Sequence, residues 1–275
     1  MDIFNYEFMQ RAFLAGLIVA LMCPLIGTFI VIKRQSLLGE GLGHIAFAGV
    51  TGASFLSLYP PLGAAGLTVL SAIGIEIVRR RHNQYTDMIL ALFFYTGLAL
   101  AVIFASLTKM PSTGLLNFLF GSILTVTEAD IMSIAAVAVV VGLIIYSIYS
   151  QLLYTSFDEQ VAITAGVPVN RVNMIFSILT ALVVVMGMTI VGILLIGALM
   201  IVPVASAHLW KVGFTKTLWI SELYSIFSVL VGLIVAFEFD LAPGGTIVLM
   251  AILAYALTFG GSMVANRMLV TSISD

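Results

Sequence analysis

Long runs of apolar residues alternate with short polar connections along the whole chain. Each run is close to the ~20 residues that an α-helix needs to cross the hydrocarbon core of a bilayer. The strands of a transmembrane barrel would instead alternate apolar and polar positions. The pattern therefore predicts an all-α fold, a polytopic bundle of transmembrane helices.

Eight or nine spans are expected, because the run from Val172 to His208 is long enough for two helices and contains glycines near 187–192. We expect a break there, with one half either spanning or re-entrant. The predicted helices are Phe8–Ile32, Leu37–Leu58, Leu62–Val78, Asp87–Leu107, Ile131–Tyr149, the two halves of Val172–His208, Thr217–Phe237 and Thr246–Val264. They leave no room for a soluble module, so we interpret residues 1–275 as one transmembrane domain.

The composition supports an integral membrane protein, with 61% hydrophobic and 9% charged residues. Soluble domains carry about a quarter charged residues. Membrane lipid is thus an obligatory partner, while a net charge of −2 and the lack of a basic tract exclude a nucleic-acid partner. The lone cysteine, Cys23, excludes an internal disulfide.

The distribution of Lys and Arg predicts the orientation, since these residues gather on the cytoplasmic side. If the connection after the first helix is cytoplasmic, only Arg11 and Lys109 lie outside. The inner set is Lys33, Arg34, Arg79, Arg80, Arg81, Arg171, Lys211, Lys216 and Arg267. With nine spans, the N-terminus is outside and the C-terminus is cytoplasmic. The outer side then collects carboxylates that could attract cations or a basic protein, or could be ordinary solvated helix ends.

Glu40 and His44 are polar side chains in a stretch otherwise suited to lipid, SLLGEGLGHIAFAGV. A carboxylate within a membrane helix costs about 2.5–3.5 kcal/mol on insertion scales. Residues four apart share one face of a helix, and a carboxylate oxygen beside an imidazole nitrogen is half of a divalent-cation site. The alternative is a hydrogen-bonded pair that pins two helices together. The adjacent glycines, which let another backbone approach, favour the cation site.

The other titratable groups give weaker signals. Glu222 lies within a predicted span and could be a third ligand, a proton relay or a gate, although it could also reach the inner interface. His82 and His208 fall at helix ends and are expected at the surface. We therefore expect no carboxylates inside the membrane besides Glu40 and, if it is inside, Glu222.

Residues 151–171 form the longest predicted inner loop. Within it, Asp158 as cap, Glu159 in the first turn, Gly166 as stop and Pro168 just beyond predict a short helix. Such a helix, lying on the cytoplasmic surface, could engage an ATPase or could be an ordinary loop helix. The chain lacks the G-x-x-x-x-G-K-[ST] motif of a P-loop and the H-E-x-x-H motif of a metalloprotease.

Several segments together resemble the ABC-3 family, the membrane permeases of bacterial ABC importers for zinc and manganese. The segments are the N-terminal stretch through SLLGEGLGHIAFAGV, LLNFLFGSILTVTEADI, SFDEQVAITAGVPVNRV, VGILLIGALMIVPVASA and FDLAPGGTIVL. Glu40 stands where the family typically has Asp, followed by His44 at the His position. The likeness runs nearly end to end.

The resemblance implies a homodimeric transport subunit, not an enzyme, in the bacterial inner membrane. It implies two cytoplasmic ATPase subunits that hydrolyse ATP and an extracellular metal-binding protein that delivers the ion. Glu40 and His44 would line the metal path by alternating access. The residues that would transmit motion from the ATPase are Phe157, Asp158, Glu159, Gln160, Ala162 and Gly166.

The resemblance implies no permanently bound cofactor, because the metal is the transported substrate. Imidazole suits Zn²⁺, and a carboxylate tolerates Mn²⁺. The opening FMQRAFLA and the run LFGSILTVT are more similar to the zinc branch. We therefore expect zinc ahead of manganese, with iron third. The alternative is a stand-alone secondary cation transporter, against which the few intramembrane carboxylates argue.

Overall fold

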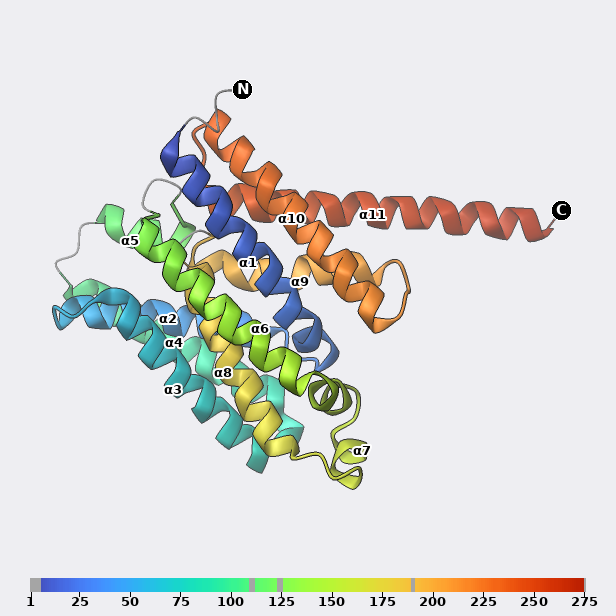
Figure 1. Cartoon of the computed structure of the whole chain (residues 1–275), viewed down its shortest axis with the longest axis horizontal. Coiled ribbons are helices and arrows are strands. Elements are labelled where there is room, and N and C mark those ends of the chain that lie inside the picture. Colours follow the sequence, from blue (N-terminus) through green and yellow to red (C-terminus); the bar gives the residue numbers. More distant parts are fainter. Residues whose placement is uncertain (1–5, 109–111, 123–125, 189–190, 275) are drawn as a thin grey trace.

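The computed structural model describes residues 6–108, 112–122, 126–188 and 191–274, and these residues contain helices and no strand (Figure 1). Seven helices are long and apolar enough to cross a membrane: α1 (Glu7–Ile32), α3 (Pro60–Arg81), α4 (Thr86–Leu107), α6 (Glu128–Phe157), α8 (Val169–Gly187), α10 (Phe214–Glu238) and α11 (Pro243–Ser274), the last through Met263. The other elements are α2 (Leu37–Phe55), η2 (Asn83–Tyr85), α5 (Ser112–Phe120), α7 (Glu159–Thr164) and α9 (Ile193–His208). The predicted all-α polytopic fold is confirmed at the level of seven candidate spans.

The central helix of the bundle is α2, which contacts α3, α4, α8 and α9. It is buried along nearly its whole length from Leu38 to Ala53. Its glycines allow this burial, because a Cβ at Gly49 would lie only 2.5 Å from the carbonyl oxygen of Gly63 on α3. The sequence of α2 is thus adapted to close contact with other helices rather than to contact with lipid.

A second group of helices is formed by α1, α9, α10 and α11, and α1 also packs against α6. Figure 1 shows α11 running away from the other helices, with the C-terminus at its far end. Of its membrane-length window, 28% is buried within the chain. The periphery of this group therefore presents a largely uncovered apolar helix.

The predicted break in the run from Val172 to His208 is confirmed, since α8 ends at Gly187 and α9 begins at Ile193. Gly192 has φ +87°, in the left-handed region that favours glycine. A Cβ there would also lie 2.4 Å from the carbonyl oxygen of Leu119 at the end of α5. The two halves are therefore separate helices.

Two expectations about the middle of the chain were wrong. The helix predicted over Ile131–Tyr149 is longer, because Thr127 and Asp130 form a capping box at its start and the apolar residues after Tyr149 continue it to Phe157. Residues 151–157 are consequently helical rather than part of a loop. The nine-residue α5 had no counterpart in the sequence analysis, since it is too short to give a spanning signal.

Candidate metal-binding site

Glu40 and His44 lie one turn apart near the start of α2. Glu40 is exposed, whereas His44 is buried, with only 7% of its surface exposed. The imidazole meets the ring of Phe94 on α4 edge to face, with centroids 4.6 Å apart. Its Nδ1 is buried and has no hydrogen-bond partner. A buried polar nitrogen without a partner is costly and uncommon in native proteins, which points to a ligand.

Glycines on three helices hold the backbone around this pair. A Cβ at Gly97 of α4 would come within 2.8 Å of the backbone nitrogen of Ile45, and one at Gly43 within 2.9 Å of the carbonyl oxygen of Ile193. On α9, a Cβ at Gly197 would lie 3.1 Å from Cβ of Glu40. Helices α4 and α9 therefore approach the backbone of α2 closely at the pair, as the glycines allow.

Within one chain, the pair is not joined by a third side chain that could hold a metal ion, as far as the described residues show. In the described part of the chain, no group of three or more His, Cys, Asp or Glu side chains could hold a metal ion. Glu222 lies on α10, which packs against α1, α9 and α11, so the structure does not bring it to the pair. His82 and His208 are exposed at the ends of α3 and α9, as expected.

A carboxylate that the sequence analysis did not single out is buried, because Glu76 on α3 is 2% exposed. The guanidinium of Arg79 donates two hydrogen bonds to the Glu76 carboxylate, from Nε to Oε2 at 2.9 Å and from Nη2 to Oε1 at 3.1 Å. Arg80 adds a third contact at 3.5 Å. The spacing of Glu76 with arginines three and four residues later was the signal in the sequence.

The short helix predicted after residue 157 is present as α7. The side chain of Asp158 accepts hydrogen bonds from the backbone nitrogens of Gln160 and Val161, and Gly166 adopts φ +79° beyond the helix end. Ala162 is buried, whereas Phe157, Val161 and Ile163 are exposed. Helix α7 thus exposes two large apolar side chains, Val161 and Ile163, and the exposed Phe157 ends α6 just before it.

A polar network connects α7 to the bundle. Nη1 of Arg79 donates to Oε1 of Glu159 at 3.1 Å, and Nδ2 of Asn173 donates to the same oxygen at 2.8 Å. Nζ of Lys33, just after α1, donates to Oδ1 of Asn173 at 2.6 Å. Burial lowers the pKa of Lys33 to about 8, an effect that the Glu159 carboxylate opposes.

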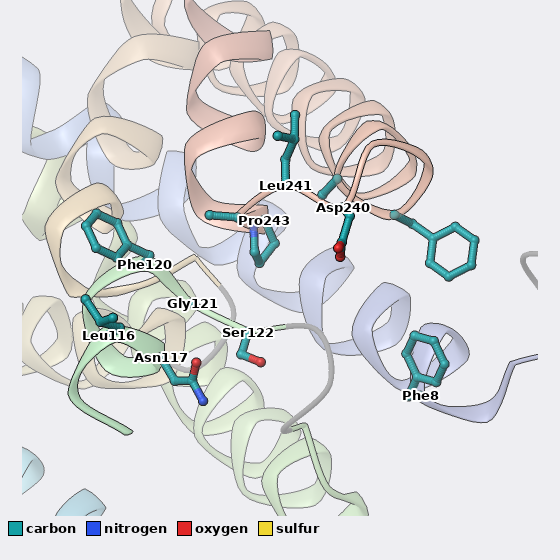
Figure 2. A pocket seen from close by; sticks show the side chains of 12 residues that line it. Phe8, Leu116, Asn117, Phe120, Gly121, Ser122, Asp240, Leu241 and Pro243 are labelled. Atoms are coloured by element: carbon teal, nitrogen blue, oxygen red, sulfur yellow. The ribbon is translucent and has the colours of Figure 1, made fainter. Parts of the chain in front are cut away.

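Two cavities lie near the two ends of α1. One of about 1100 Å³ lies where residues 32–35, 84–88 and 155–160 meet, next to α7. The other, of about 450 Å³, lies beside the first turn of α1 and is shown in Figure 2. Asn117, Ser122 and Asp240 supply its polar lining, and Phe8 stands at the α1 side.

The seven apolar helices define a multi-pass helical membrane protein, and its central helix α2 carries Glu40 and His44. The model of the ABC 3 transport family matches residues 5–261. The chain belongs to this family.

Relatives and a solved structure agree with this assignment. The manganese transport system membrane protein MntC of Halalkalibacterium halodurans is 30% identical, covering 94% of this chain and 88% of that protein. The manganese import system permease protein ScaB of Streptococcus gordonii is 31% identical, with 93% and 91% covered. A chain of PsaBC from Streptococcus pneumoniae in complex with Fab superposes with a TM-score of 0.83 at 31% identity, covering 94% of this chain and 93% of that one.

Proposed function

We propose that this chain is the membrane permease of an ATP-driven importer for a divalent transition-metal ion, with Glu40 and His44 lining the ion path. The observation that carries the proposal is the buried Nδ1 of His44, which has no hydrogen-bond partner one turn from an exposed carboxylate. A carboxylate oxygen and an imidazole nitrogen are ligands that Mn²⁺, Fe²⁺ and Zn²⁺ share.

Manganese is the first candidate for the ion, because relatives about 30% identical are named as manganese transport proteins. Zinc is the second, because imidazole suits zinc well. Glu40 offers the same carboxylate group as an aspartate at this position would. The longer side chain therefore changes how far the carboxylate extends and not the type of ligand. Competition between the two ions for uptake distinguishes these candidates.

A second copy of the chain would complete the site. One chain offers two ligand side chains, and Glu40 is exposed on the single chain. A homodimer that faces two such pairs together would supply four ligands, a number that transition metals commonly take. A transport site also needs to release its ion, so a shell shared between two moving subunits suits the task.

We infer nine membrane spans for the topology, by adding α2 and α9 to the seven apolar helices. We assign all nine helices to one domain in the bacterial inner membrane, with the N-terminus outside and the C-terminus in the cytoplasm. The start of α9 then lies beside α2, since a Cβ at Gly43 would come within 2.9 Å of the carbonyl oxygen of Ile193.

The cytoplasmic partner would be an ATPase subunit that binds α7. The exposed side chains of Val161 and Ile163 on α7, together with Phe157, present an apolar surface, and Asp158 caps the helix. Gln160 and Gly166 flank this surface, while Ala162 packs inward. On the outer side, the cavity beside Asp240 is the place where a metal-binding protein would deliver the ion.

Metal uptake by cells that lack their own importers tests this proposal. Expression of the chain with its ATPase and binding protein should restore uptake, and Glu40→Ala or His44→Ala should abolish it while leaving membrane insertion intact. Gly142→Ala is the matched control, because a Cβ at Gly142 meets open space. Uptake that survives both substitutions would overturn the site.

Deletion of residues 157–166 separates an ABC permease from a secondary transporter. An ATP-driven importer should lose uptake, because its coupling surface is gone. A proton-coupled transporter with the same ion site would keep it.

A further inference from the structure

Two cavities adjoin where the end of α9 meets α10 and α11. The first, of about 530 Å³, lies between α10 and α11, and its apolar walls are Ile220, Leu223, Phe227, Ala254 and Leu257. The second, of about 860 Å³, is lined by residues 208–211, 257–259 and 261–263. Trp210, Leu257 and Thr258 line both cavities, which therefore form one continuous groove. We call it the α10–α11 groove.

The polar side chains in the wall of this groove bind one another. Nε1 of Trp210 donates to the hydroxyl of Tyr224 at 3.2 Å, and the hydroxyls of Tyr224 and Thr258 share a hydrogen bond of 2.6 Å. The Thr258 hydroxyl in turn donates to the carbonyl oxygen of Ala254 at 2.8 Å. These three side chains use their donors on protein acceptors, so this part of the groove favours a hydrocarbon ligand over a polar one.

The groove has about the depth of one leaflet of a bilayer. Along α10, the rise from Lys216 to Phe227 is about 16 Å at ~1.5 Å per residue. This is close to half of the ~30 Å hydrocarbon core. Trp210 is 59% exposed at the mouth of the groove, and tryptophan side chains gather at membrane–water interfaces. The groove therefore runs from the interface toward the middle of the bilayer, as an acyl chain does.

The mouth of the groove is positively charged. His208 and Lys211 line the wider cavity, and the Lys211 side chain is exposed. Among the described residues that line the two cavities there is no Asp or Glu. The distribution of lysine and arginine predicts that this end of α9 faces the cytoplasm, where the membrane leaflet holds anionic lipids. Basic pockets between helices on that side bind anionic headgroups.

We propose that the α10–α11 groove binds an anionic phospholipid, with an acyl chain between α10 and α11 and the phosphate of the headgroup at Lys211. The two ends of the groove favour this occupant together, because the deep walls are apolar and the mouth pairs an ammonium group with an indole at the level of the headgroups. The inference requires that the chain spans a membrane, and it does not depend on the proposed metal path.

Quenching of Trp210 fluorescence by brominated lipid tests the inference, because a brominated acyl chain quenches an indole that it contacts. The chain has two tryptophans, and the other one, Trp219, lines neither cavity, so the test uses Trp219→Phe. The purified chain is placed in phosphatidylcholine vesicles with a minor fraction of phosphatidylglycerol. The bromine is carried either by the phosphatidylglycerol or by an equal amount of the phosphatidylcholine. Association with phosphatidylglycerol should be favoured about fivefold, from the attraction of one lysine to anionic lipid.

Two further substitutions in the same chain probe the two ends of the lipid. Lys211→Asn removes the charge, and asparagine tolerates the φ of +51° at this position. It should abolish the preference for phosphatidylglycerol. Gly261→Leu fills the wider cavity, because a Cβ at Gly261 meets open space, and should lower quenching by phosphatidylglycerol to the level of phosphatidylcholine.

Gly260→Leu is the matched control for the filled cavity. A Cβ at Gly260 also meets open space, but this residue lines neither cavity, so quenching should stay as in the Trp219→Phe chain. Equal quenching by the two brominated lipids in that chain would overturn the inference. A preference for phosphatidylglycerol that persists in both Lys211→Asn and Gly261→Leu would also overturn it. Quenching by neither lipid would show that protein covers the groove, for example a second copy of the chain, and would likewise contradict a lipid site.

Discussion

Two clusters of charged side chains lie at the two ends of α1 and join it to other helices by similar chemistry. At the start, Arg11 bonds Glu7 at 2.6 Å and Glu128 of α6 at 3.1 Å, and both carboxylates are 76% exposed. At the end, Lys33 meets the cluster in which Glu76 is 2% exposed and Glu159 29%. Exposed ion pairs contribute about 0–1 kcal/mol, whereas breaking a buried one costs about 3–5 kcal/mol. We call the cluster of Lys33, Glu76, Arg79 and Glu159 the inner cluster. Of the two clusters, only this one can therefore fix the positions of helices.

The largest difference between the two clusters is expected when the central arginine of each is replaced. Arg79→Met leaves the Glu76 carboxylate buried beside Arg80 alone and should lower the free energy of unfolding by about 3–5 kcal/mol. Arg11→Met should lower it by less than about 1 kcal/mol. Thermal unfolding of the purified protein in detergent measures both, and equal losses would contradict the difference in burial.

The pH dependence of stability should depend on the inner cluster through Lys33. Its pKa of about 8 is below that of an unfolded lysine, so above about pH 8 the unfolded state binds more protons than the folded state. Stability should therefore rise from about pH 8 to about pH 10, between the folded and the unfolded pKa of Lys33, since the folded state then no longer holds a buried ammonium. Glu76, Arg79 and Glu159 are the charged groups that face it.

Lys33→Met is the control for this pH effect. It should flatten the rise in melting temperature relative to the unmodified chain. An unchanged pH profile would show that Lys33 keeps its proton over this range.

The N-terminal caps of α7 and α6, one near each of the two clusters, should differ less in their effect on metal uptake. Asp158→Ala and Thr127→Ala each remove a cap and should each cost about 1 kcal/mol of helix stability. Helix α7 has six residues and depends on its cap, whereas α6 has 30. Metal uptake should fall for Asp158→Ala and persist for Thr127→Ala, and equal uptake in the two variants would contradict this expectation.

The smallest effect is expected for Glu222, which lies on α10 outside both clusters. Glu222→Gln should change the free energy of unfolding by about 0.5 kcal/mol or less and leave metal uptake in place. Loss of uptake with normal stability would instead identify Glu222 as the gate or relay considered from the sequence.

The sequence predicted those features that depend on local chemistry. The Asp158 cap, the stop at Gly166 and the break after Gly187 follow from residues close together in the chain, and all three are present. The Glu40–His44 spacing likewise follows from one helical turn. What the spacing did not indicate is that Glu40 is exposed and His44 buried, because this depends on how α4 and α9 pack around α2.

The inner network could not be derived in the same way. Glu76 was overlooked because a carboxylate near three arginines resembles a solvated helix end. The arginines that hold it are themselves bound to Glu159 and Asn170, which lie 80 and 90 residues further along the chain. The pairing of Glu159 with Arg79 is a long-range contact, and no pattern in a single sequence specifies such a contact.

Direct measurement of bound manganese tests the central claim, that Glu40 and His44 hold the ion and that a second copy completes the site. The purified importer is equilibrated with Mn²⁺, and the bound ion is counted per chain. We predict about one ion for two chains, and none at this site after Glu40→Ala or His44→Ala. Unchanged binding in both variants would contradict the account.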